Sequence, residues 1–170
     1  TLTAIAGAYG VTLNDLFRAN PALGGIPTIR AGQVLVISYT DTPPYSFFVG
    51  GYAYPFIKQD ILDTVTPFME VLIPFTYGIR ADGSLYELND ERLLNAARRY
   101  GTAAWMHLST YTEGERFDTE LATAVLASTG VQQLLIQNIL AKMREKGYTG
   151  LDVDFEFLGK ENALPYAAFL

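Results

Sequence analysis

Alternating acidic and apolar residues near the end of the chain constrain its fold most strongly. Residues 150–157 read GLDVDFEF, so that Asp152, Asp154 and Glu156 recur at every second position. Because residues i, i+2 and i+4 share one face of a β-strand, the pattern predicts a strand with three acids on one side and apolar residues on the other. A long helical pattern at about residues 120–146 precedes it. This order predicts a helix-then-strand step of an α/β fold, in which parallel strands are buried on both faces.

The row of acids also indicates chemistry. Neighbouring carboxylates repel one another and a buried charge needs a partner, so a strand that keeps three of them usually holds a proton or a cation. Two other interpretations stay open. The acids could face solvent, or they could bind calcium or magnesium, which prefer carboxylate ligands. The twelve-residue loop of an EF-hand does not surround them.

The acidic segment resembles a known family signature. Residues 148–156 are similar to the fourth-strand signature of glycoside hydrolase family 18, the family of chitinases and related N-acetylglucosaminidases, which reads Asp-Gly-x-Asp-x-Asp-x-Glu. Thr149 replaces the first Asp of that signature. The four matching positions are Gly150, Asp152, Asp154 and Glu156.

The composition excludes several classes of function. The 170 residues are 49% hydrophobic, which is enough to bury a core, and no apolar run approaches the ~20 residues of a membrane helix. The net charge is −6 and no basic cluster exceeds residues 98–99, so neither nucleic acid nor a membrane is an expected partner. The chain has no cysteine, and its single histidine, His107, cannot form a His–His metal pair. We expect no cofactor and no metal.

Residues 1–38 have a pattern of their own. Apolar residues at helical spacing predict a first helix ended by Gly10, and Thr12 with Asp15 predicts a capping box at the start of a second. Asn20-Pro21 stops that helix, and residues 33–37 are expected to form a strand. The unit resembles a LysM module, a small α+β unit that binds glycans containing N-acetylglucosamine. The first strand of such a module would lie upstream of Thr1.

The rest of the chain alternates strands and helices. After a proline-containing linker at 39–46, we expect strands at 48–54, 71–77, 103–111 and 150–157, and helices at 90–100, 120–146 and 163–170. The helical region at 120–146 has a candidate break near Gly130. Repeated strand-then-helix units indicate a parallel sheet or a (β/α)₈ TIM barrel, which is the fold of family 18 enzymes. A barrel usually needs about 250 residues. Residues 47–170 therefore correspond to its first four strands, and the chain looks like a fragment.

The resemblance implies a mechanism for the three acids. Family 18 enzymes use substrate-assisted catalysis, in which the sugar's own N-acetyl oxygen attacks the anomeric carbon. Glu156 would then protonate the leaving oxygen. Asp154 would orient the acetamido group and stabilise its positive charge, while Asp152 would share a proton with Asp154.

Four further residues are candidates for substrate binding. Tyr52 and Phe75 fall where family 18 members keep aromatic residues at the innermost sugar site. Ser109 aligns with the serine of the family's third-strand Ser-x-Gly-Gly motif, although Tyr111 and the next residue replace the glycines. That departure resembles the spore-cortex and cell-wall lytic subgroup, which joins LysM modules to such barrels. His107 is expected to be a packed or hydrogen-bonded strand residue.

The resemblance as a whole implies a bacterial glycoside hydrolase that is secreted or associated with the cell wall or spore. Its expected substrate is peptidoglycan or a chitin-like glycan, cleaved at N-acetylglucosamine linkages with retention. The alternatives are a chitinase, a non-catalytic glycan-binding protein of the lectin type, and a sugar-phosphate barrel enzyme that uses a metal held by the acids.

Overall fold

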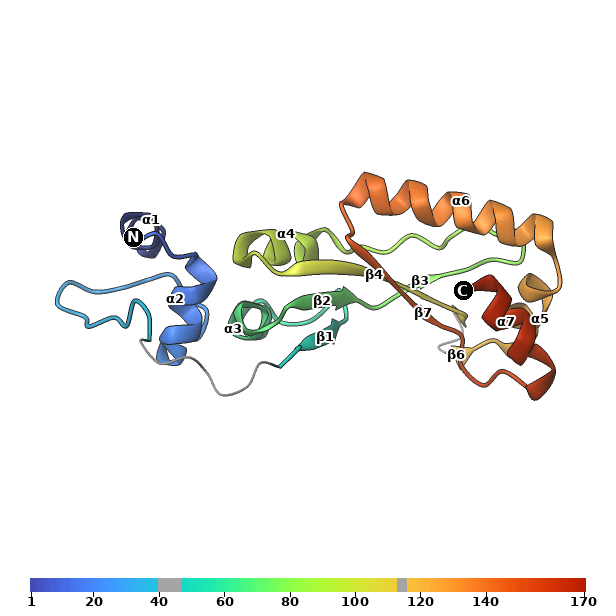
Figure 1. Cartoon of the computed structure of the whole chain (residues 1–170), viewed down its shortest axis with the longest axis horizontal. Coiled ribbons are helices and arrows are strands. Elements are labelled where there is room, and N and C mark those ends of the chain that lie inside the picture. Colours follow the sequence, from blue (N-terminus) through green and yellow to red (C-terminus); the bar gives the residue numbers. More distant parts are fainter. Residues whose placement is uncertain (40–46, 113–115) are drawn as a thin grey trace. The chain divides into compact units, whose positions relative to one another are not determined.

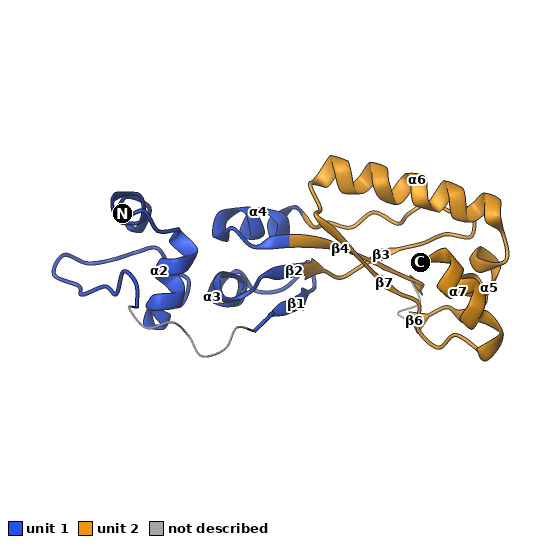
Figure 2. Ribbon diagram, viewed as in Figure 1, with its two compact units in different colours: residues 1–72, 91–103 blue, residues 73–90, 104–170 orange. Residues whose placement is uncertain are grey.

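The computed structural model describes residues 1–39, 47–112 and 116–170, and almost all of the linker predicted at 39–46 lies outside them. The chain forms two compact units (Figures 1 and 2). Unit 1 contains residues 1–72 and 91–103, and unit 2 contains residues 73–90 and 104–170. Helices and strands alternate along the chain, as an α/β fold requires.

The N-terminal helices follow their local sequence signals. Helix α1 spans Leu2–Tyr9 and ends at Gly10, whose φ of 70° lies in the left-handed region that glycine favours. Helix α2 spans Leu13–Ala19. The predicted capping box is present, because the Thr12 hydroxyl accepts from the Asp15 backbone N–H and the Asp15 carboxylate accepts from the Thr12 backbone N–H. A short 3₁₀-helix, η1, follows at Pro21–Leu23.

The strand predicted at residues 33–37 is wrong, because this segment has no regular secondary structure. A side chain takes the place of a partner strand. The Asn20 amide oxygen accepts from the Val36 N–H at 2.8 Å, and its amide nitrogen donates to the Val36 carbonyl at 2.7 Å. The same nitrogen donates to the Leu16 carbonyl at the end of α2. Both polar groups of Val36 are therefore satisfied without a β-ladder.

Unit 1 continues with β1 (Gly50–Ala53), helix α3 (Gln59–Val65), the 3₁₀-helix η2 (Thr66–Phe68) and α4 (Glu91–Tyr100), together with the first residues of β2 (Val71–Pro74) and β4 (Ala103–Ser109). Strand β1 is shorter than predicted and pairs with β2. Helix α3 was not predicted from the sequence. It has only seven residues, between Pro55 and the 3₁₀-helix η2 at residues 66–68, and so short a segment gives little helical periodicity.

The N-terminal helices share a hydrophobic core with α4. Tyr100 at the end of α4 packs edge-on against Phe17 of α2, with ring centroids 5.5 Å apart. Its hydroxyl donates to the Gly25 carbonyl at 2.9 Å. A Cβ atom on Gly25 would lie only 1.5 Å from the Asp63 carbonyl oxygen of α3, so the approach requires glycine. The buried members of this core are Leu2, Ala6, Leu16, Phe17, Leu23 and Tyr100.

Unit 2 is built on a parallel sheet. Strand β4 pairs in parallel with β3 (Tyr77–Gly78) and with β7 (Gly150–Asp154). The strands predicted at 71–77 and 103–111 are each interrupted, the first at Phe75 and the second after Ser109. A short antiparallel pair that was not predicted, β5 (Tyr111–Thr112) with β6 (Arg116–Phe117), follows β4.

The helical region predicted at 120–146 consists of two helices, α5 (Thr119–Leu126) and α6 (Thr129–Lys146), and the break between them lies just before Gly130. Helix α6 begins at the N-cap Ser128 and ends at Gly147, which has φ 80° as expected of a C-terminal cap. Helix α7 (Ala163–Phe169) follows a 3₁₀-helix, η3 (Lys160–Asn162). Within the described ranges no single helix has the length and apolarity needed to cross a membrane, although α5 and α6, bent by 104° at their junction, pass that test as a pair.

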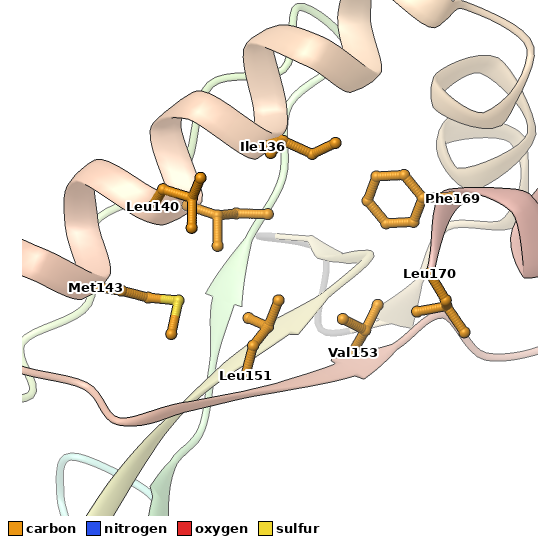
Figure 3. A pocket seen from close by; sticks show the side chains of 8 residues that line it. Ile136, Leu140, Met143, Leu151, Val153, Phe169 and Leu170 are labelled. Carbon is orange, nitrogen blue, oxygen red and sulfur yellow. The ribbon is translucent and has the colours of Figure 1, made fainter.

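The apolar face of β7 is turned toward helices. Leu151 and Val153 line a cavity of about 360 Å³ between β7, α6 and α7 (Figure 3). Apolar side chains of the two helices line the rest of the cavity, and Phe169 reaches it from α7. This arrangement agrees with the alternation read from the sequence, because the acids occupy the positions between these apolar residues. The other lining residues are Ile136, Ile139, Leu140, Met143 and Leu170.

Candidate active site

The two acids within β7 meet His107 of the neighbouring strand. The parallel register places Asp152 beside His107 and Asp154 beside Ser109. The His107 Nε2 atom lies 3.6 Å from Asp152 Oδ2 and 3.5 Å from Asp154 Oδ2. His107 is 1% exposed, whereas both carboxylates are partly exposed. The acids therefore have a buried imidazole on one side and an opening to solvent on the other.

A chain of hydroxyl groups lies behind His107. Its Nδ1 atom is 2.6 Å from the Thr76 hydroxyl, which is 2.9 Å from the Ser109 hydroxyl. The Ser109 oxygen accepts from the Tyr111 backbone N–H at 3.2 Å. Ser109, predicted to bind substrate, is fully buried and contributes to this network. The expectation that His107 is a hydrogen-bonded strand residue agrees with these contacts.

Aromatic rings continue outward from the imidazole. Phe75 stacks on His107 with centroids 4.8 Å apart, and Tyr111 meets Phe75 edge-on at 5.6 Å. Phe117 of β6 packs against Tyr111 at 5.4 Å and against Phe157 at 6.2 Å. Two predicted residues, Phe75 and Tyr111, thus lie next to the acid site. Sequence analysis missed Phe117 and Phe157, although an aromatic residue directly after Glu156 was a visible signal.

Glu156 lies beyond the strand. The prediction that β7 continues to residue 157 is wrong, because the ladder with β4 ends at the pair Ser109–Asp154. Glu156 is in the turn that follows, next to Phe157, whose φ of 57° is unusual for a residue with a side chain. Only Asp152 and Asp154 therefore share the face of a strand, and Glu156 is presented by a turn at its carboxyl end.

Helix α7 holds this turn in place. Phe155, which is buried, stacks on Tyr166 at 5.5 Å and on Phe169 at 5.8 Å. The Tyr166 hydroxyl donates to the Val153 carbonyl at 3.0 Å. Burial raises the pKa of Tyr166, and the nearby carboxylates raise it further, so this hydroxyl remains a donor.

Burial also sets the charge of the imidazole. Loss of solvation lowers the pKa of His107, and the carboxylates of Asp152 and Asp154 counter this only in part. His107 is therefore neutral at pH 7, with one nitrogen protonated.

A second buried acid fixes the start of β7. Asp90 is fully buried, and its Oδ2 atom accepts from the Tyr77 and Tyr148 hydroxyls, each at 2.5 Å. Lys146 donates to Asp90 Oδ1 at 3.0 Å. Burial raises the pKa of Asp90, but the hydrogen bonds from Tyr148, Tyr77 and Lys146 outweigh it and hold the pKa below its usual value. Tyr148 is thus anchored two residues before β7 begins.

The remaining predicted residue is Tyr52. It lies on β1 in unit 1 and is 60% exposed, and its role in substrate binding stays a prediction. Among residues that the structure describes, no three side chains of the His, Cys, Asp or Glu types are arranged to hold a metal ion.

Comparison with known proteins assigns the two parts of the chain. Residues 1–38 match the LysM domain family. The chain shares its α/β fold with solved structures of a spore cortex-lytic enzyme and a chitinase. The predicted resemblance to the LysM-containing, spore-cortex and cell-wall lytic subgroup of glycoside hydrolase family 18 is confirmed.

Three relatives define this similarity. The chain is 25% identical over 177 residues to YdhD of Bacillus subtilis, which is named as a sporulation-specific glycosylase, and the match covers all of this chain and 40% of YdhD. The crystal structure of the spore cortex-lytic enzyme SleL from Bacillus cereus superposes with a TM-score of 0.69 at 24% identity, covering 99% of this chain and 40% of SleL. A class V chitinase from Pseudomonas fluorescens gives a TM-score of 0.67 at 20% identity, covering 72% of this chain and 39% of the chitinase. The chain spans about 40% of the length of these relatives.

Proposed function

We propose that this chain is part of a glycoside hydrolase that cleaves N-acetylglucosamine linkages in the peptidoglycan of the spore cortex or cell wall. One observation carries the proposal. Asp152 and Asp154 project from a parallel strand toward a buried neutral histidine, and Glu156 follows them at the carboxyl end of that strand. Catalytic residues of such barrels lie at the carboxyl ends of strands. Relatives named as a glycosylase and a cortex-lytic enzyme support the same activity.

The proposed reaction is substrate-assisted and retains the anomeric configuration. Glu156 gives its proton to the glycosidic oxygen as the bond from that oxygen to C1 breaks. The carbonyl oxygen of the 2-acetamido group forms a bond to C1 and produces a cyclic, positively charged intermediate. Water then attacks C1, Glu156 takes the proton from that water, and the bond from C1 to the acetamido oxygen breaks. The proton on Glu156 is thus restored.

Asp152 and Asp154 stabilise the charge that develops on the acetamido group. Both side chains meet the buried His107 imidazole on the same face of β7. Asp154, which is nearer the carboxyl end of β7, accepts from the acetamido N–H and faces the positive charge. Asp152 supports Asp154 from the preceding position on the same face of β7. A preorganised charge in a partly buried site stabilises such an intermediate without rearrangement of water.

The LysM domain supplies attachment to the substrate in this proposal. Residues 1–38 would bind the N-acetylglucosamine-containing strands of peptidoglycan, or of a chitin-like glycan, and hold the enzyme at the wall or spore cortex. The protein would therefore act outside the cytoplasm.

Replacement of the proposed acid tests the mechanism. In the intact protein, Glu156→Gln keeps the size of the side chain and removes the transferable proton, so kcat on an N-acetylglucosaminyl substrate should fall by at least ~10²–10⁴-fold with little change in KM. Glu161→Gln is a matched control, because Glu161 is exposed and lies five residues further on. It should leave kcat within about twofold, as expected of a surface substitution.

Further measurements separate the alternatives. Asp154→Asn should lower kcat strongly, and most on substrates that carry the N-acetyl group, whereas Asp152→Asn should mainly shift the pH profile. Proton NMR of the first product should show the retained anomer. Near-normal turnover by Glu156→Gln, or loss of wild-type activity in a chelator, would reject this mechanism. Preference for chitin oligosaccharides over cortex peptidoglycan would instead favour a chitinase.

A further inference from the structure

One direction of the hydrogen-bond chain behind the acids gives each hydroxyl in it an acceptor. The Thr76 hydroxyl also lies 3.4 Å from the His107 carbonyl, which is a longer contact than its 2.6 Å approach to Nδ1. The Tyr111 backbone N–H can only donate, so the Ser109 oxygen accepts it and the Ser109 hydroxyl hydrogen is free to point to Thr76, 2.9 Å away. The Thr76 oxygen then accepts from Ser109 and donates its own hydrogen to His107 Nδ1 at 2.6 Å. Nδ1 is therefore an acceptor.

The proton of the neutral imidazole is then on Nε2. This atom lies between the two acids, with only 0.1 Å separating its distances to Asp154 Oδ2 and Asp152 Oδ2. The opposite tautomer would direct the Nε2 lone pair at two carboxylate oxygens, which is repulsive. Phe75 stacks on the ring and blocks its rotation. Among the described residues of unit 2, Asp152 and Asp154 are titratable groups that face His107. On its other sides the imidazole contacts the Thr76 hydroxyl, which is linked to Ser109, and the Phe75 ring.

We propose that His107 is a positioning residue for the reaction: its Nε2–H, directed by the Ser109–Thr76 hydroxyl chain, holds the side chains of Asp152 and Asp154 in place. The assignment rests on the proposed function. A neutral donor that faces two carboxylates can interact with either of them and adds no charge to the site. Burial keeps the imidazole from becoming a second cation in the site.

Two substitutions separate this role from simple packing. Gln places an amide nitrogen near the position of His Nε2, whereas Asn places one near Nδ1. In the intact protein, His107→Gln should therefore keep a donor to the acids, and His107→Asn should lose it. We expect His107→Asn to lower kcat about tenfold, with KM nearly unchanged, because a hydrogen bond to a charged group is lost. The acidic limb of its pH–rate profile should move to higher pH by about one unit. His107→Gln should stay within about threefold of the wild type and keep its profile.

The hydroxyl chain is tested through the tautomer. Nitrogen-15 NMR of the histidine-labelled intact protein, with the His107 signals assigned by their absence in His107→Gln, should show a neutral ring protonated at Nε2 at pH 7. Thr76→Val keeps the shape of the side chain and removes the donor to Nδ1. It should therefore shift the Nδ1 resonance in the NMR spectrum and the acidic limb of the pH–rate profile. Thr102→Val is the matched control. Thr102 is also buried, but its hydroxyl donates to backbone carbonyls in unit 1.

The outcomes are distinct. Equal pH profiles for His107→Gln and His107→Asn, a proton on Nδ1, or a charged ring at pH 7 would each overturn the assignment. Full activity of Glu156→Gln would overturn the proposed function instead, while the tautomer signal and its response to Thr76→Val would still report the His107 contact. A shift of the acidic limb in His107→Asn that Thr102→Val does not reproduce would support the proposal.

Discussion

Asp90 shows how single residues in this protein carry buried charge. Its carboxylate has no exposure to solvent and is held by two tyrosine hydroxyls and the Lys146 ammonium group. A buried carboxylate is tolerated only when such donors replace its hydration. Burial also raises the pKa values of Tyr77 and Tyr148, as do their hydrogen bonds to Asp90, so both remain donors throughout the physiological range.

We predict that Tyr148→Phe destabilises the protein by about 2 kcal/mol at pH 7, because one hydrogen bond to a buried charge is lost. The effect should depend on pH in a defined direction. The pKa of Asp90 is lowered by folding, so its contribution to stability is present above its unfolded value of about 3.8 and is lost as the pH falls through the folded value. The difference between wild type and variant should therefore shrink below pH 4. Urea unfolding at pH 7 and pH 3 measures it.

Tyr166→Phe is the control for this substitution. Its hydroxyl donates to the neutral Val153 carbonyl, so the loss should be about 1 kcal/mol and nearly independent of pH. An equal, pH-independent loss in both variants would contradict the role given to Asp90.

At the scale of elements, helix ends that depend on local contacts could be predicted from the sequence. Strand ends that depend on pairing with a distant strand could not. Gly10, Gly147 and the Thr12 capping box are local signals, and each forms as predicted. Strand β7 ends at Asp154 because its neighbour β4 ends at Ser109. Ser109 lies 45 residues earlier in the sequence, so no local pattern around Asp154 shows where the strand ends. The prediction of a strand at 33–37 was wrong for the same reason, because the segment is held by the Asn20 side chain and not by a neighbouring strand.

The residues of the candidate site also fall into those that a local sequence pattern predicts and those that depend on distant contacts. The acids were predicted because their spacing matches a family signature that is continuous in sequence. The partners of His107 depend on the parallel register of β4 with β7 and on the approach of Thr76, and neither can be read from a local pattern. Ser109 was predicted from a motif, but its burial in the network came only from the structure.

The contact between Asn20 and Val36 gives an element-scale prediction. Asn20→Ala removes two hydrogen bonds that hold the 31–39 segment and one that ends α2, so the LysM domain should lose about 1–3 kcal/mol. Hydrogen exchange at the Val36 amide should accelerate, and sedimentation of the intact protein with insoluble peptidoglycan should weaken.

Asn14→Ala is the matched control, since the Asn14 amide oxygen is buried and has no hydrogen-bond partner within the described ranges. It should leave the Val36 amide protected. Unchanged exchange at Val36 in Asn20→Ala would show that the side chain does not hold the segment.

At the scale of the whole molecule, apolar surface on unit 2 predicts self-association. The lining of the cavity in Figure 3 remains partly open, with Ile136 41% and Leu140 43% exposed. Strand β7 pairs only with β4 among the described strands, and an unpaired strand edge invites contact with another chain. We expect the 170-residue chain expressed by itself to be inactive and to oligomerise or aggregate, as measured by light scattering. Ile136→Glu should reduce this association, whereas Glu161→Gln should not.

A monodisperse monomer of the 170-residue chain that hydrolyses glycans would contradict this expectation. It would mean that the site needs no further strands of a barrel.

The core that α1 and α2 share with α4 bears on whether residues 1–38 could be replaced by another module. Recombination that replaced residues 1–38 with an unrelated binding domain would leave Tyr100 without Phe17 and its Gly25 acceptor. The surface of α3 that Gly25 covers would be exposed as well. Only glycine fits there, because a Cβ atom would collide with the Asp63 carbonyl. A foreign module would therefore have to bring both a complementary helix and a glycine at that position. Residues 1–38 are therefore built into the same hydrophobic core as α4, and we expect that they cannot be exchanged without loss of that core.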